Sequence, residues 1–99
     1  MDQGQIAPEG RLDVGEVGDL YLHHLEHVMR RKPTTIQDYR IILGRHLTPY
    51  FGRSALVRIT TNQVSGYMTA KLNQGLSPKT INNHLNFLHG VFVFAVKRE

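Results

Sequence analysis

The chain has 99 residues, enough for one small domain with a single hydrophobic core but not for a second, catalytic lobe. It contains no cysteine, which excludes disulfides and thiolate metal sites, and it shows neither a signal-peptide core nor an apolar run of about 20 residues, so we expect a soluble, cytoplasmic protein without a membrane span. The net charge of +4 is unevenly divided: residues 1–29 carry six acids and one base, whereas residues 30–99 carry eleven bases and two acids, a balance that attracts phosphate although a solvated surface explains it equally well.

The first part of the chain predicts a mobile arm followed by a helix. Residues 1–12 combine glycine, proline and scattered charge without an apolar period, which is typical of an arm. From about Val14 to Arg31 apolar residues recur at helical spacing, with acids at the front and the basic residues 30–32 at the end, as the helix dipole favours. Pro33 then ends this helix. Its two predicted apolar stripes are Val17, Leu20, Tyr21, His24 and Val28, and Leu22, Leu25 and Met29.

Three further helices are predicted downstream. The second begins at a threonine cap, Thr34 or Thr35, and stops near Thr48, which precedes a proline. The third spans about residues 60–75, from a capping box to a glycine cap, and the fourth spans about residues 78–97. No segment alternates convincingly as a strand, so we predict four helices. Their predicted buried positions are Ile36, Tyr39, Leu43 and Leu47; Val64, Tyr67, Met68 and Leu72; and Ile81, Leu85, Leu88, Phe92, Ala95 and Val96.

The fourth helix separates an apolar face from a polar one. Ser77 fits its N-cap and Pro78 its first position. Asparagine pairs with adenine in the major groove, lysine neutralises phosphate, and a helix N-terminus with its Ser77 and Thr80 hydroxyls can hold a phosphate, so the polar face indicates DNA contact. Gly90 on this face favours a close approach, either of a DNA backbone or of a packed helix. At about 100° per residue the polar arc comprises Lys79, Asn82, Asn83, Asn86, Gly90 and Lys97.

Several motifs, in order and at matching spacing, resemble one known family. They are Thr35-Ile36-x-x-Tyr39-x-x-x-Leu43-x-x-His46-Leu47-x-Pro49-x-Phe51-Gly52, the Ile59-Thr60 turn, Leu76-Ser77-Pro78-Lys79-Thr80-Ile81-Asn82-Asn83-His84-Leu85, and Phe92-x-x-Ala95-Val96-Lys97. Over about residues 14–99 the chain resembles the core-binding (SAM-like) domain of phage integrases and tyrosine recombinases. The resemblance implies an all-α, four-helix SAM-like orthogonal bundle, here residues 13–99, that grips the core recombination site as one half of a clamp. The implied partners are double-stranded DNA of the core site, a C-terminal catalytic domain and other recombinase protomers on DNA.

We therefore predict a DNA-binding domain that is not catalytic by itself and has no cofactor or metal site. In the family, the catalytic arginines, histidine and tyrosine belong to a C-terminal domain, and we expect that half to be missing from this chain. His27-Val28-Met29-Arg30 has the His-x-x-Arg spelling of the catalytic box but precedes the core-binding helices. His23 and His27 could bridge a metal, yet zinc takes three or four protein ligands, so an exposed histidine face is the favoured interpretation. The four tyrosines are assigned to packing.

The predicted DNA contacts form two groups, and two alternative functions stay open. Phosphate contacts are assigned to Arg30, Arg31, Lys32, Arg45 and Lys97. Groove or near-groove contacts are assigned to Thr35, Gln37, Arg40, Lys79, Asn82, Asn83 and Asn86, with Ser77 and Thr80 at the helix start. The alternatives are a small helical protein-interaction module, whose Leu- and Phe-rich stripes seat a partner helix, and a helix-turn-helix regulator. Strong salt dependence of DNA binding separates DNA binding from protein interaction.

Overall fold

The computed structural model describes residues 11–97, which form four helical rods and contain no β-strand. In chain order the rods are α2 (Val14–His27); a continuous rod of α3 (Pro33–Ile41), the π-helical η1 (Ile42–Leu47) and α4 (Thr48–Phe51); α5 (Thr61–Asn73); and α6 (Pro78–Lys97). A short 3-10 turn, η2 (Leu56–Arg58), precedes α5. The predicted all-α, four-helix architecture is confirmed for the described residues.

Helix α2 begins where the sequence predicts but ends one turn early. Asp13 and Glu16 form a capping box, in which each side chain accepts a hydrogen bond from the other's backbone amide. The helix ends at His27 and not at Arg31, because the chain reverses direction through Arg30, whose φ is 55°. The predicted end is therefore wrong. Outside the helix, the predicted stripe residues Val28 and Met29 are 64% and 48% exposed.

The start of α2 is anchored by the chain just before it. The predicted mobile arm, residues 1–12, lies outside the described residues except for Arg11 and Leu12. The Leu12 carbonyl accepts a hydrogen bond from the Leu56 amide at 2.9 Å, and Asp13 forms an isolated antiparallel bridge with Ala55. These bonds tie the beginning of α2 to the connector that leads into α5.

The second rod differs from the prediction at both ends. Lys32 occupies the N-cap without a side-chain hydrogen bond and Pro33 takes the first turn, so the predicted threonine caps are wrong. The rod also continues past Pro49 to Phe51, where Gly52 with φ of 63° ends it. Proline lacks an amide hydrogen and its ring crowds the carbonyl four residues back. Here the preceding turn is widened into a π-helix, with the Thr48 amide bonded to the Leu43 carbonyl, which lets the rod pass through the proline.

The two C-terminal helices start as predicted. Thr60 and Gln63 form the predicted capping box of α5, and Gly75 beyond its end has a φ of 92°. At the start of α6 the Thr80 amide donates to the Ser77 hydroxyl at 3.2 Å, which confirms Ser77 as the cap. The two helices thus form a hairpin joined by residues 74–77.

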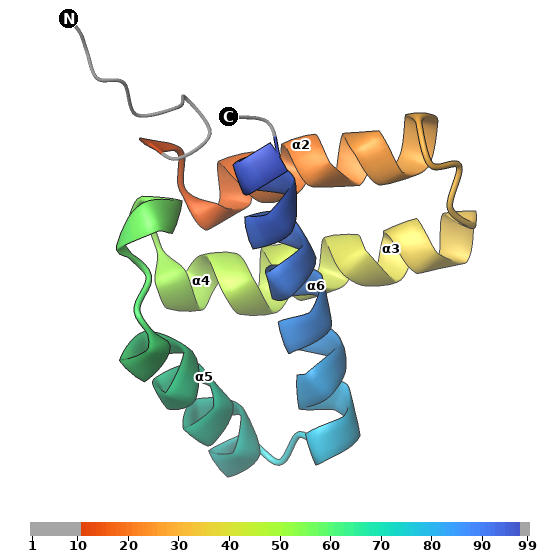
Figure 1. Cartoon of the computed structure of the whole chain (residues 1–99). Helices are drawn as coiled ribbons and strands as arrows, with labels where there is room; N and C mark the ends of the chain where they lie inside the picture. The colour runs from red at the N-terminus through yellow and green to blue at the C-terminus, as the bar shows by residue number, and fades with distance from the viewer. Residues whose placement is uncertain (1–10, 98–99) are drawn as a thin grey trace, which may run out of the picture.

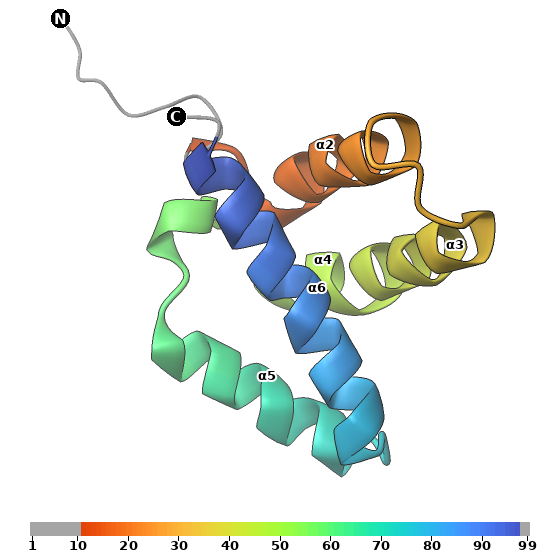
Figure 2. The same cartoon turned by 45° about the vertical axis from the view of Figure 1, so that its right-hand side comes forward.

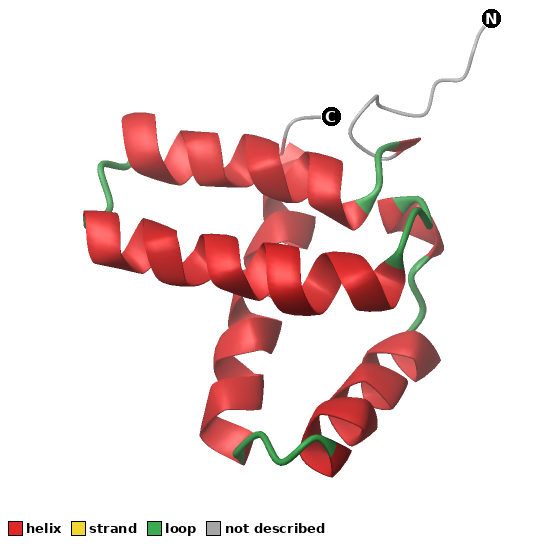
Figure 3. Ribbon diagram, turned by 180° about the vertical axis from the view of Figure 1, so that it is seen from behind, coloured by secondary structure: helices red, strands yellow, loops and turns green. Residues whose placement is uncertain are grey.

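Helix α6 crosses the other long helices. Figure 1 shows α2 and the α3–α4 rod side by side, with α6 lying across both and α5 beside its first half. The rotated view in Figure 2 preserves this crossing, and the reverse view in Figure 3 shows α2 and the α3–α4 rod in front of α6. The bundle is orthogonal in this sense: one long helix packs across an antiparallel pair. Two surfaces of α6, one on each side of the crossing, therefore border concave corners.

The core fills the space between α6 and the antiparallel pair. Ile81, Leu88 and Ala95 are buried as predicted, whereas Met68, Leu72 and Val96 are 38%, 50% and 65% exposed, so their predicted burial is wrong. Met68 and Leu72 line an open cavity of about 100 Å³ between α5 and the start of α6, so the packing of the two helices leaves them accessible. None of the helices in that range is long and apolar enough to cross a bilayer.

Candidate nucleic-acid interface

The turn between α2 and α3 gathers basic and hydroxyl side chains around a concave surface. Arg31, Lys32 and Thr35 line a cavity of about 380 Å³ whose floor includes the rings of Tyr21 and Tyr39. Arg31 and Lys32 are exposed, so their charges are available to a ligand. The structure thus brings together three of the predicted DNA contacts from the α2–α3 turn and the start of α3.

A second cavity extends this surface onto α6. Lys97 of α6 and Arg31 line a space of about 200 Å³, together with Met29 and Val93. Arg31 borders both cavities, so the two adjoin, and we call the surface around them the basic groove, defined by Arg31, Lys32, Thr35 and Lys97. The sequence assigned all four residues to DNA contact, but their spacing in the chain did not indicate that residues 31 and 97 lie on one surface.

The polar arc of α6 is divided by the packing of Gly90. A Cβ atom on Gly90 would lie 2.8 Å from Cζ of Tyr21, so the close approach at this glycine is between helices α6 and α2. The alternative left open by the sequence, a DNA backbone at Gly90, is not what the structure supports. Four exposed polar residues of the arc, Lys79, Asn82, Asn83 and Asn86, lie before Gly90, and Lys97 lies after it.

Two residues near the start of α6 face the α3–η1 rod. Thr80 and Asn83 line a cavity of about 300 Å³ together with Asp38, His46 and His84. Ser77 is occupied by its capping role, since its hydroxyl accepts from the Thr80 amide and donates to the Thr80 hydroxyl at 3.0 Å. Asn83 therefore lies on the α3 side of α6, and Asn82 on the α5 side, where it lines a cavity with Met68 and Leu72, while both Asn82 and Asn86 are exposed.

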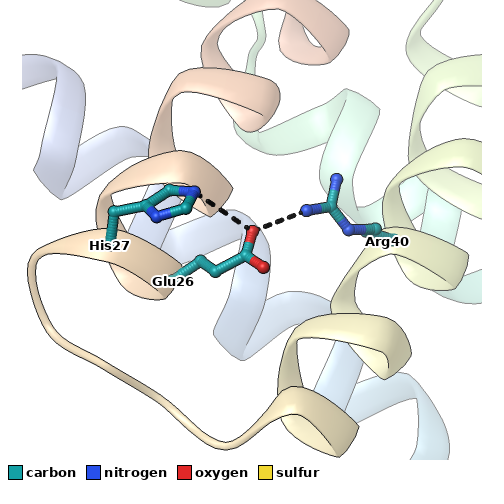
Figure 4. A network of polar contacts seen from close by, with 3 residues as sticks. All are labelled: Glu26, His27 and Arg40. Atoms are coloured by element: carbon teal, nitrogen blue, oxygen red, sulfur yellow. Dashed lines mark hydrogen bonds and ion pairs between the residues drawn. The ribbon is translucent and has the colours of Figure 1, made fainter.

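Other predicted contacts lie elsewhere. Arg40 donates to Glu26 at 2.8 Å, and the same carboxylate lies 3.7 Å from Nε2 of His27 (Figure 4). Arg40 also borders a different cavity, between α2 and the α3–α4 rod. Gln37 and Arg45 are exposed on the outer side of that rod. These residues stay predictions, and Arg40 would have to leave its carboxylate partner to reach a phosphate.

A buried polar cluster lies beneath the α6 N-terminus and was not predicted. The Tyr67 hydroxyl lies 2.6 Å from Nδ1 of His84, and the rings of His84 and His46 are 4.5 Å apart. Lys71 is 6% exposed and its ammonium lies 5.4 Å from the centre of the Tyr67 ring. We call these four residues, from α5, α6 and η1, the imidazole cluster.

Burial sets the protonation of the imidazole cluster. Desolvation, with His46 and Lys71 acting in the same direction, lowers the pKa of His84 to about 4. Desolvation and then Lys71 and Arg45 lower the pKa of His46. Both imidazoles are therefore neutral near pH 7. His84 could have been found from the sequence, because it follows Ile81 by three residues and precedes Leu88 by four on the apolar face of α6.

Comparison with known proteins identifies the family. The family described as the phage integrase N-terminal SAM-like domain matches residues 19–99. The chain belongs to this family. The SAM-like domain is also 31% identical over 68 residues to the ICEBs1 integrase of Bacillus subtilis (strain 168), an alignment that covers 69% of this chain and 18% of that relative. No solved structure matches the chain.

The match confirms the resemblance found in the motifs. The chain spans less than a fifth of the length of its integrase relative. The family match covers α2 from Asp19 through α6, and so includes the basic groove and the imidazole cluster. Within residues 11–97, no three His, Asp or Glu side chains gather closely enough to hold a metal ion.

Proposed function

We propose that this SAM-like domain binds double-stranded DNA as the core-binding domain of a site-specific tyrosine recombinase, with the basic groove against the phosphate backbone. The observation that carries the proposal is that Arg31, Lys32 and Lys97 line two adjoining cavities, which share Arg31, in a phage integrase domain. Phosphate contacts position a protein on DNA, and basic side chains supply most of that energy. Residues 13–99 are the binding unit in this proposal, and the cytoplasm is its site of action.

The outward amides of α6 are proposed to contact bases. Asn82 and Asn86 are exposed on the first half of α6, with Lys79 beside them. An asparagine that pairs with adenine contributes about 1–3 kcal/mol of discrimination against the wrong base. Replacing either asparagine by alanine is therefore expected to reduce preference for the true site while leaving binding to random DNA unchanged.

Charge variants with a matched control test the basic groove. The double variant Arg31→Ala/Lys32→Ala is compared with Arg53→Ala/Arg58→Ala, which removes the same charge from exposed residues of the connector before α5. The measurement is fluorescence anisotropy of a random duplex at several salt concentrations. We expect wild-type dissociation constants of about 10⁻⁴ to 10⁻⁶ M and a salt slope smaller by about 0.9 for each phosphate contact that the groove variant loses.

The outcomes separate the proposal from its alternatives. Equal effects of the two double variants would contradict the assignment of the groove. Binding that is absent even at low salt would favour a protein-interaction module instead. A helix-turn-helix regulator would show its strongest effects at the turn between α5 and α6, with the groove variant unchanged.

We propose that the domain by itself does not cleave DNA, and that a C-terminal catalytic domain and neighbouring recombinase protomers complete the reaction. An attacking tyrosine must lose its proton readily, yet burial raises the pKa of Tyr67, and burial with the neighbouring Tyr39 raises the pKa of Tyr21. Incubation with a nicked core-site duplex and denaturing gel electrophoresis is the test. A covalent protein–DNA adduct would overturn this part of the proposal.

A further inference from the structure

The imidazole cluster brings basic groups together inside the bundle. His46 of η1 faces His84 of α6 and Lys71 of α5, and the exposed Arg45 precedes it on η1. Tyr67 of α5 completes the contacts of His84. One acid, Asp38 of α3, lines the adjoining cavity together with His46 and His84, and its side chain is exposed. A proton on either imidazole would thus add a positive charge beside Lys71 with little water to screen it.

The hydrogen bonding of the cluster also changes when an imidazole gains a proton. Tyr67 keeps its proton and donates to Nδ1 of His84, which places the His84 proton on Nε2. Protonated His84 carries a hydrogen on Nδ1, so the 2.6 Å contact persists only if it reverses, with Nδ1 donating to the Tyr67 hydroxyl oxygen and the Tyr67 hydrogen losing its acceptor. Nδ1 of His46 is buried without a hydrogen-bond partner. That nitrogen would bond more favourably if α6 and η1 separated and admitted water.

The cluster is coupled to the surface by its position on α6. His84 is adjacent in the chain to Asn83, and both line the same cavity as Thr80, His46 and Asp38. The π-helical turn that carries His46 is a departure from regular helical hydrogen bonding, a feature that often accompanies functional sites. A small separation of α6 from η1 would therefore move the start of α6 relative to α3.

We propose that the stacked pair His46 and His84 is an acid-sensitive latch that holds the N-terminal half of α6 in the position from which the domain binds DNA. Proton uptake by the pair separates α6 from η1 and displaces Thr80 and Asn83. This inference rests on the proposed function for its biological consequence, although the opening itself is measurable without DNA. Opening of the latch lowers the affinity of the domain for duplex DNA as the pH falls.

That direction is opposite to the ordinary behaviour of a basic DNA-binding protein. Protonation of surface histidines on such a protein adds positive charge, which strengthens phosphate binding. A latch that opens must outweigh this gain. With His84 at a pKa of about 4 when closed and 6.5 when open, acidification from pH 7.5 to 5 shifts the opening equilibrium about 30-fold through this residue alone.

The test measures duplex affinity between pH 7.5 and 5 for the 99-residue chain and two variants. The double variant His46→Phe/His84→Phe keeps two aromatic rings in contact but removes both groups that take up the proton. His89→Gln is the control, because it removes an exposed imidazole from the same helix. We expect wild type and His89→Gln to bind more weakly as the pH falls, and the double variant to bind more tightly.

Backbone amide chemical shifts of Thr80 and Asn83, recorded in the same pH range without DNA, measure the opening directly. We expect them to move with the histidine titration in wild type and to stay fixed in His46→Phe/His84→Phe, while far-UV circular dichroism keeps the helical signal. Tighter binding by wild type at pH 5 than at pH 7.5, or fixed Thr80 and Asn83 shifts while His84 titrates, would overturn the latch. Moving shifts without DNA binding at any pH would retain the latch and refute the proposed function.

Discussion

Gly90 provides the sharpest test of how α6 packs on α2. A Cβ atom there would lie 2.8 Å from Cζ and 2.9 Å from Cε2 of Tyr21, and closer still to its hydroxyl oxygen. Tyr21 cannot turn aside freely, because its ring lies between Phe87 and Phe94 at centroid distances of 5.7 and 5.3 Å. Gly90→Ala should therefore push helices α2 and α6 apart, and the close packing around Tyr21 opposes this separation.

The expected magnitude follows from two opposing effects. Alanine in place of glycine stabilises a helix interior by about 1 kcal/mol, whereas overpacking a core costs about 1–3 kcal/mol. We expect Gly90→Ala to lower the free energy of unfolding by about 1 kcal/mol. At Gly44, nothing lies within 4 Å of the added Cβ atom, so Gly44→Ala should raise it by about 0.5–1 kcal/mol.

Urea denaturation followed by circular dichroism measures both variants. The two midpoints should move in opposite directions with unchanged slopes, which indicates a change in native stability alone. In a Tyr21→Phe background, the cost of Gly90→Ala should shrink but persist, because the ring carbons remain within 3 Å. A Gly90→Ala variant at least as stable as wild type would refute the packing argument.

Three further predictions concern single residues. Tyr67→Phe should lower the free energy of unfolding by about 1–3 kcal/mol, measured by urea denaturation at pH 7, because Nδ1 of His84 loses its partner; an unchanged midpoint would contradict the hydrogen bond. Because the folded pKa of His84, about 4, lies below its unfolded value of 6.5, its contribution is complete above pH 6.5 and is lost toward pH 4, by about 3 kcal/mol in all; denaturation midpoints that stay constant across this range would refute the burial argument. Arg30→Gly should raise the thermal midpoint, because glycine adopts a φ of 55° without strain, while reducing duplex affinity; a lower midpoint would show that the arginine side chain stabilises the turn.

Helix starts were predictable from the sequence, and helix ends were less so. The boxes at Asp13 and Thr60 and the cap at Ser77 depend on a side chain within three residues of the amide that it binds, so local sequence determines them. The end of α2 depends instead on the turn that returns α3 along α2, a tertiary requirement. The passage of the second rod through Pro49 likewise depends on the widened turn before it.

The candidate site was predicted as residues but not as a surface. Charge and the family motifs indicated Arg31, Lys32, Thr35 and Lys97, because residue type alone suggests phosphate contact. Their joint location depends on α6 crossing the α2–α3 pair, and helical periodicity gives no information about crossing. The same limit applies to Gly90. Its place on the polar arc was predicted correctly, but its contact with Tyr21, almost seventy residues earlier in the chain, was not predictable from the period of one helix.

Departures from local sequence preference occur close to the proposed DNA surface. Arg30 has a backbone conformation that favours glycine, at the turn that carries the basic groove. The π-helical turn and the buried His84 lie beneath the first half of α6. Each costs stability that an ordinary helix, a glycine turn or an apolar side chain would avoid. Such costs persist in proteins chiefly where function opposes stability. Variants that remove these features should therefore stabilise the domain and weaken its DNA binding or change its pH dependence. Gly44→Ala should also raise stability but leave DNA binding unchanged, because Gly44 lies away from the groove.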